Sequence, residues 1–173
     1  MERLQNWANR VLSPAEQSAR LRELSRLLNL LKDDPDQGLK YALPMGGDAP
    51  RGLAPPGTRL PSHGVDFRYP TSGGGPAGYW GLPNETRMLL TARYRELAQR
   101  EIGLGRYRRA AYIYAELLRE MEPAVSALKA GGYYREAAAI YEERLNRPYE
   151  AAACLEEGGL WDEALLRYER LEN

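Results

Sequence analysis

The sequence offers few side chains that could carry out catalysis. His63 is its single histidine and Cys154 its single cysteine. Ser62 directly precedes His63, but neighbours in sequence rarely adopt the geometry of a catalytic Ser–His pair. One cysteine and one histidine are also too few for a zinc site within one chain. The neighbours of Cys154 are alanines and a leucine, and such surroundings raise the pKa of a thiol and leave it inert, so we expect it in the core.

Two short motifs are also compatible with ligand binding. Residues 73–78, Gly-Gly-Gly-Pro-Ala-Gly, have the spacing of a dinucleotide-binding loop, but that loop needs a strand before it and a helix at its end. Asp33, Asp34 and Asp36 could ligate Ca²⁺, yet the remaining oxygen ligands of an EF-hand are missing and helix capping accounts for these acids. The sequence therefore predicts no catalytic, cofactor or metal site, and the protein is interpreted as a non-enzyme.

A regular spacing organises the C-terminal half of the chain. The pattern G-x-(Y/W)-x-x-A-x-x-x-Y occurs three times with a period of 27, beginning at Gly105, Gly132 and Gly159. Its other members are Tyr107, Tyr134 and Trp161, then Ala110, Ala137 and Ala164, then Tyr114, Tyr141 and Tyr168. A fixed repeat period of this length is typical of stacked helical units. Such units more often build binding surfaces than active sites, so the pattern favours a binding function.

Composition divides the chain into three regions. Residues 1–43 are predicted to be helical, with Ser13 capping a first helix and Asp34 a short second one. The first helix carries one apolar stripe, formed by Leu21, Leu24, Leu28 and Leu31 and widened by Leu27 and Leu30. Residues 44–83 are rich in Pro and Gly. Residues 84–173 are predicted to be a helical array, with Asn84 as an N-cap, a second helix over 107–118, and later helices opened by Pro123 and Pro148.

The middle region has too many breakers for regular structure but too many large apolar side chains for a solvated tether. It contains Leu53, Leu60, Phe67 and Trp80. We expect residues 44–83 to form an extended strap over the helices, docked on them over 44–69, with a candidate short strand at 65–69. Residues 70–78 are expected to be its mobile part.

Charge and composition exclude several classes of protein. Acidic and basic residues balance at 24 each, which argues against a general nucleic-acid or membrane-surface binder. Residues 84–119 nevertheless carry eight Arg against four Glu, and residues 120–173 carry six basic against twelve acidic residues. An array with one basic and one acidic end could stack head to tail or dock a polarised partner, and the alternative interpretation is that these charges form solvated faces. No run approaches a membrane span and no signal peptide is recognised, so we expect a cytoplasmic protein.

The three copies of this pattern resemble the second-helix half of a tetratricopeptide repeat. Gly105, Tyr107, Ala110 and Tyr114 carry the likeness in the first copy. The period is shorter than that of the family, because the first helix of each unit is short. The resemblance implies an all-α fold, a right-handed α-solenoid of helical hairpins, over residues 84–173. It does not imply the family's peptide groove.

A second resemblance covers more of the chain. Residues 34–44 (Asp-Pro-Asp-Gln-Gly-Leu-Lys-Tyr-Ala-Leu-Pro), 51–57 (Arg-Gly-Leu-Ala-Pro-Pro-Gly) and 108–113 (Arg-Arg-Ala-Ala-Tyr-Ile) are similar to accessory proteins of bacterial MoxR–vWA–β-propeller ternary systems. This likeness implies a non-catalytic adaptor that works beside an AAA+ ATPase and a vWA-domain protein.

These patterns predict a scaffold that binds another protein through its helices. Tyr112, Tyr133 and Tyr149 do not belong to the repeated pattern and are expected to be exposed partner contacts. Leu165, Tyr168 and Leu171 belong to the last helix, which no further unit covers. We expect that end to be covered by a second molecule, with folding back of the N-terminal helix as the alternative. The alternative function is an enzyme or nucleotide-binding subunit whose site a partner chain completes.

Overall fold

A computed structural model describes residues 14–45, 59–60, 62, 64–69 and 82–172. In these ranges the chain is all-α, as the sequence predicts. Its α-helices are α2 (Pro14–Asp33), α3 (Pro35–Lys40), α4 (Asn84–Gly103), α5 (Tyr107–Tyr112), α6 (Met121–Ala130), α7 (Tyr134–Glu143), α8 (Pro148–Glu157) and α9 (Trp161–Glu172), and α5 continues into a π-helix, η1 (Ile113–Leu118). No helix in the described ranges combines the length and apolarity that crossing a membrane would need.

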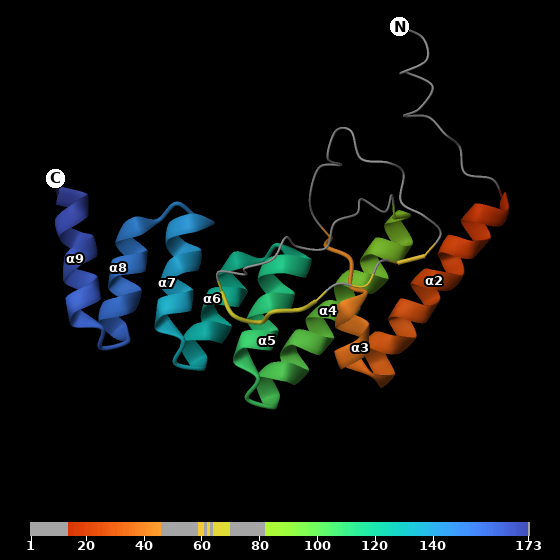
Figure 1. The fold of residues 1–173 in the computed structure, drawn as a ribbon, viewed down its shortest axis with the longest axis horizontal. Coiled ribbons are helices and arrows are strands. Elements are labelled where there is room, and N and C mark those ends of the chain that lie inside the picture. Colours follow the sequence, from red (N-terminus) through yellow and green to blue (C-terminus); the bar gives the residue numbers. More distant parts are fainter. Residues whose placement is uncertain (1–13, 46–58, 61, 63, 70–81, 173) are drawn as a thin grey trace, which may run out of the picture.

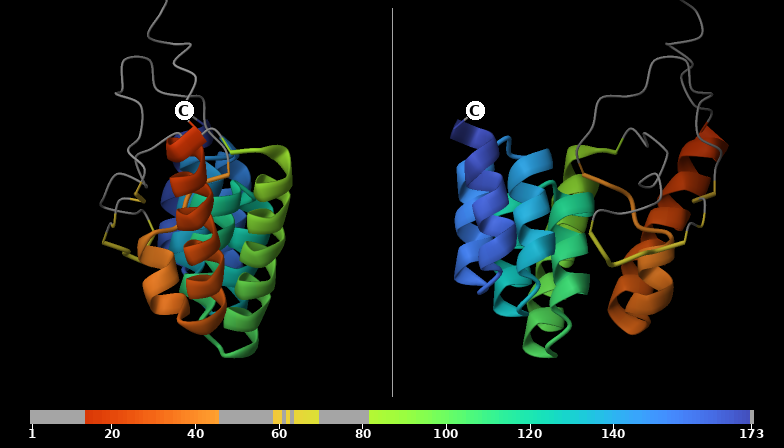
Figure 2. Two further views of the ribbon diagram at one scale, coloured as in Figure 1. Left: turned by 90° about the vertical axis from the view of Figure 1, so that its right-hand side faces the viewer. Right: turned by 60° about the vertical axis from the view of Figure 1, so that its left-hand side comes forward.

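The helices form a row that follows the order of the chain (Figure 1). From α4 to α9 each helix packs against the next one along the sequence, and α2 packs against α3 and α4. Seen from the α2 end, the helices lie behind one another (Figure 2, left). α2 and α9 therefore lie at opposite ends, so the alternative in which the N-terminal helix folds back over the last one is wrong.

The N-terminal helices follow the sequence prediction with one shift of phase. Asp34 caps α3, because its carboxylate accepts a hydrogen bond of 3.1 Å from the Gln37 amide. The Ser13 cap lies outside the described residues. In α2 the buried side chains are Leu24, Leu27 and Leu31, whereas Leu21 is 53% exposed. The predicted stripe was therefore wrong at Leu21, which faces solvent because the core-facing row begins one turn later.

The same turn follows a helix in each of the three copies of the repeat. Gly105, Gly132 and Gly159 have φ values of 71°, 77° and 72°, a left-handed conformation in which a Cβ would be strained. In each turn the glycine amide and the following amide donate back to the preceding helix, which is the Schellman arrangement. Arg119 and Asn146, also one repeat period apart, are the non-glycine residues with positive φ in the described part.

The aromatic residue of the pattern packs on a glycine of the next helix pair. A Cβ at Gly131 would lie 2.7 Å from Tyr107 Cβ, and one at Gly158 would lie 2.4 Å from Tyr134 Cγ. Each tyrosine thus covers the glycine that directly precedes the turn of the next repeat. The spacing of these glycines is set by contact between neighbouring helices as well as by turn geometry.

Ion pairs between helices recur with the same spacing. Arg108 pairs with Glu136, and one repeat period later Arg135 pairs with Glu163. The hydrogen bond from Arg135 holds the pKa of the Glu163 carboxyl below its usual value. Arg95 and Glu120 form another pair, and the positions one period later hold Glu122 and Arg147 in contact with the charges exchanged. A pair whose signs exchange together keeps its attraction.

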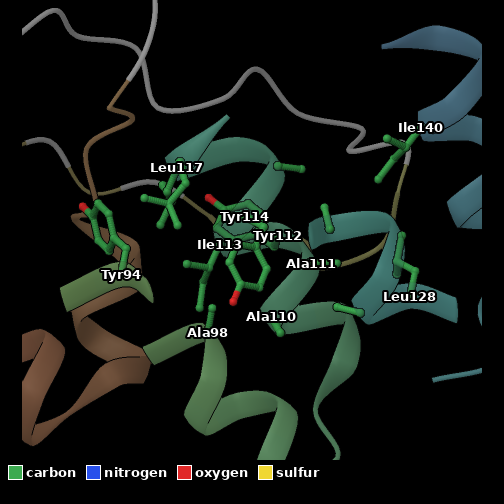
Figure 3. Packing of buried hydrophobic residues seen from close by; sticks show 14 of the residues in the cluster. Tyr94, Ala98, Ala110, Ala111, Tyr112, Ile113, Tyr114, Leu117, Leu128 and Ile140 are labelled. Carbon is green, nitrogen blue, oxygen red and sulfur yellow. The ribbon is translucent and has the colours of Figure 1, made fainter. Parts of the chain in front are cut away.

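The sequence places one continuous helix over 107–118, but its second half is wound as a π-helix. All of Ile113–Leu118 is buried, and Figure 3 shows Ile113, Tyr114 and Leu117 packed among the side chains of α4 and α5. The Met45 amide donates to the Leu117 carbonyl at 2.6 Å, and the Leu43 amide donates to the Tyr94 hydroxyl at 2.9 Å. These two bonds fix the segment after α3 to α4 and η1.

Two predicted helix starts differ slightly from the structure. Asn84 is the first residue of α4 and makes no capping bond, because Pro83 occupies the cap position. α6 begins at Met121, ahead of Pro123, and proline is tolerated there because amides of the first turn have no helical partner. Pro148 opens α8 as predicted.

Substituting Ala137 with leucine is expected to destabilise the protein. Ala137 is fully buried in α7, and adding methylene groups to a packed core costs roughly 1–3 kcal/mol. Thermal unfolding would measure the effect, with Ala139→Leu on the half-buried side of the same helix as the control. Equal melting temperatures for the two variants would contradict close packing at Ala137.

Candidate protein-interaction surface

The outer face of α9 carries large apolar side chains in contact with solvent. Trp161 is 63% exposed, Leu165 59% and Leu166 55%, whereas Ala164 on the inner side is 3% exposed. We call Trp161, Leu165 and Leu166 the α9 face. Single exposed hydrophobic residues are common, but three neighbouring ones on one helix indicate an interaction site.

Corresponding positions in the earlier helices are covered. Tyr107 and Tyr134 are the counterparts of Trp161 in the first and second copies of the repeat, and they pack on Gly131 and Gly158. Ala111 and Ala138, the counterparts of Leu165, are 4% and 0% exposed. Trp161 and Leu165 therefore stand at positions that are packed against other parts of the chain in the earlier copies, whereas Ala139, the counterpart of Leu166 in the second copy, is half-buried.

Of the predicted partner contacts, three lie on α9. Leu165 is exposed, and Tyr168 and Leu171 are half-buried. The Tyr168 hydroxyl lies 3.3 Å from Glu156 Oε2, to which it donates, so this ring is partly held against α8. Trp161 and Leu166 belong to the same face and were missed. The position of Trp161 in the repeat identifies it as a member of this face. Its counterpart Tyr107 packs on Gly131, whereas the described residues contain no corresponding glycine for Trp161.

The three tyrosines outside the repeated pattern are scattered. Tyr149 is 58% exposed in the first turn of α8. Tyr133 is half-buried, with the Arg108 guanidinium 4.1 Å from its ring centre. Tyr112 is only 8% exposed, so the expectation that it is exposed is wrong. Its burial raises the pKa of its hydroxyl to about 12.

Tyr112 is buried because residues 64–69 cover it. The ring of Phe67 meets that of Tyr112 edge to face with centres 5.4 Å apart, and the Arg109 guanidinium lies over Phe67. The Tyr69 amide donates to Glu136 Oε2 at 3.1 Å. Residues 64–69 form no strand, and the amides of Arg68 and Tyr69 donate to the side chains of Asp66 and Glu136. Figure 1 shows this segment crossing α5.

At Leu60 and Phe67 the predicted strap lies against the helices. Leu60 is 5% exposed, and its amide lies 3.4 Å from Glu23 Oε2 of α2. Leu53 and the predicted mobile residues 70–78 lie outside the described residues, as do His63 and the dinucleotide-like motif at 73–78.

The remaining candidates for chemistry have structural roles. Cys154 is 2% exposed, as predicted, and burial raises the pKa of its thiol, which faces the Tyr134 carbonyl. Asp34 caps α3 and Asp36 pairs with Arg109. Among the described residues no three potential metal ligands lie together.

Two depressions lie at the α2 end of the row. One, of about 510 Å³, follows the outward side of α2 and is lined by Leu21, Arg22, Ser25, Arg26, Asn29, Leu30 and Asp33. The other, of about 480 Å³, lies between α2 and the strap and is lined by Glu23, Arg26, Tyr41, Arg59, Leu60 and Ser62. Neither lies near the α9 face.

The chain matches no family model, and searches among curated proteins and solved structures gave no match.

Proposed function

We propose that this protein is a non-catalytic helical-repeat scaffold that binds another protein through the α9 face. One observation carries the proposal: Trp161 and Leu165 are more than half exposed, although the residues one repeat period earlier are covered by neighbouring helices. Covering this face would remove apolar area from water, at about 25 cal/mol per Å² of gross stabilisation.

The scaffold is proposed to be a right-handed α-solenoid of helical hairpins that recur once per repeat period. Three turns with positive-φ glycines support this architecture, as do the two tyrosine–glycine contacts and the ion pairs that recur at the same interval. In such arrays each unit buries its faces against its neighbours, so a face that the described helices leave exposed, as on α9, is available to a partner.

A cytoplasmic location and partners of the AAA+ ATPase and vWA-domain classes complete the proposal. They rest on the likeness of residues 34–44, 51–57 and 108–113 to accessory proteins of such systems. Tyr149 is a further candidate contact on the same half of the row, since its ring is 58% exposed.

Site-specific photo-crosslinking tests the proposal. A photoreactive residue replaces Leu165 in the full-length protein, produced in its native cells. The matched control replaces Leu104, which is 53% exposed in the turn between α4 and α5. We expect covalent adducts of defined mass from position 165 and none from position 104. Equal labelling at both positions, or none at 165, would contradict a docking role for the α9 face.

A further inference from the structure

The residues of α9 restrict what can cover its face. Leu165 occupies the position held by the buried alanines Ala111 and Ala138. Leucine is longer than alanine by an isopropyl group, so a helix cannot approach α9 as closely as the neighbouring helices approach Ala138. The covering body must instead offer a groove that accepts a projecting apolar side chain, as in packing of helix ridges into grooves.

A second restriction comes from charge. Arg108 and Arg135 pair with Glu136 and Glu163 of the following helix pair. One repeat period after Arg135 the chain has Asp162, which is exposed. The side of α9 that faces away from α8 therefore has an acidic side chain where the earlier copies have an arginine. α9 as a whole carries four acidic and two basic side chains. The covering body should therefore be basic where it meets Asp162.

The outward side of α2 has both properties. Its groove, of about 510 Å³, is shallow and is formed by α2 side chains, with Leu21 and Leu30 along it, Arg22 and Arg26 beside them and Asp33 at one end. Leu21 is 53% exposed, and Arg22 is exposed. α2 carries four basic and three acidic side chains, so its charge is opposite in sign to that of α9.

We propose that the α9 face of one molecule docks into the α2 groove of a second copy. The inference rests on the proposed function, since it names the occupant of the same face. α2 and α9 lie at opposite ends of the row (Figures 1 and 2), so one molecule cannot satisfy both faces itself. The contact joins two different surfaces head to tail, and repetition of such a contact gives an open chain of molecules.

Sedimentation velocity on the full-length protein tests the proposal with two variants. Leu165→Asp disables the α9 face and leaves the α2 groove intact, whereas Leu21→Glu does the reverse. Both residues are more than half exposed, so both variants should fold, which their thermal unfolding would check. Leu166→Asp, on the same face, replaces Leu165→Asp if that variant unfolds. Leu104→Asp, at an exposed leucine in neither surface, is the control.

We expect the unmodified protein and Leu104→Asp to form a concentration-dependent series of species that shrinks as salt is added. Each end variant alone should be monomeric. Their equimolar mixture should form a 1:1 dimer that does not grow, because each molecule keeps one competent end.

Three results would overturn the head-to-tail contact. Dimers of Leu21→Glu alone would show a symmetric pairing of α9 faces, which retains α9 as a docking surface. A mixture that stays monomeric would show that the two ends do not recognise each other. An unmodified protein that is monomeric at every concentration would also exclude self-docking, and the adduct at position 165 would then decide the proposed function separately.

Discussion

Replacing Arg109 with methionine is expected to lower the free energy of unfolding by about 3 kcal/mol, because a buried carboxylate loses its closer partner and keeps the largely exposed Arg106, whose guanidinium lies 3.5 Å away. The carboxylate is that of Glu101, which is 1% exposed. Arg109 Nε lies 3.3 Å from Glu101 Oε2, although the two atoms are not aligned for a hydrogen bond. Arg109 also pairs with Asp36 of α3 and lies over Phe67. This one side chain therefore joins α3, α4, α5 and the strap.

Urea unfolding with a shared analysis of all variants would measure the effect. The double variant Glu101→Met/Arg109→Met removes both charges and should regain much of the lost stability. Arg135→Met is the matched control, because its pair with Glu163 is exposed at the surface, and it should cost far less. If Arg109→Met and Arg135→Met lose equal stability, the Glu101 charge is not buried as described.

The second large effect is expected at Gly158. Its φ of −78° suits any residue, so Gly158→Ala tests space alone. The added Cβ would lie 2.4 Å from Tyr134 Cγ, and the overpacking should cost about 2 kcal/mol. The Tyr134→Ala variant makes room for the methyl group, so the two substitutions together should cost less than the sum of their separate effects.

Gly159→Ala separates backbone strain from overpacking. A Cβ there meets no atom within 4 Å, but φ is 72°, which costs a non-glycine residue about 1 kcal/mol. Its effect should be additive with Tyr134→Ala. Additivity at Gly158 as well would contradict the contact between the α8 terminus and Tyr134. Gly131→Ala with Tyr107→Ala should recover less than the Gly158 pair, because a Cβ at Gly131 would lie 2.7 Å from the Tyr133 ring as well as 2.7 Å from Tyr107.

Much of the helical arrangement could be predicted because its signals are local. The Asp34 cap acts within a single helical turn, and Gly105, Gly132 and Gly159 mark the turns by a conformation that other residues avoid. The burial of Cys154 follows from its apolar neighbours. Each of these features depends on a few adjacent residues, so a short stretch of sequence is enough to predict it.

The features that could not be predicted depend on residues far apart in the chain. Tyr112 lies outside the repeated pattern but is covered by Phe67, which belongs to the strap and comes well before it in the chain. Leu21 has the spacing of the α2 stripe, yet which side of α2 is buried depends on how α3 and α4 pack against it. The π-helix at 113–118 accepts a backbone hydrogen bond at Leu117 from the distant Met45 amide, which no local pattern encodes.

The candidate site was partly predictable. Leu165, Tyr168 and Leu171 follow from their place in the third copy of the repeat, although of these three Leu165 alone is more than half exposed. Trp161 required knowledge of what Tyr107 and Tyr134 contact, namely the glycine that precedes the turn of the next repeat.

Fluorescence of Trp161 tests most directly whether the α9 face is open and becomes covered on binding. Substituting Trp7 and Trp80 with phenylalanine leaves Trp161 as the one tryptophan of the chain. In dilute protein we expect the emission and acrylamide quenching of a solvent-exposed indole. Raising the concentration, or adding the protein captured at position 165, should shift the emission to shorter wavelength and reduce quenching. An indole already shielded in dilute solution, or one unchanged by both additions, would contradict the account.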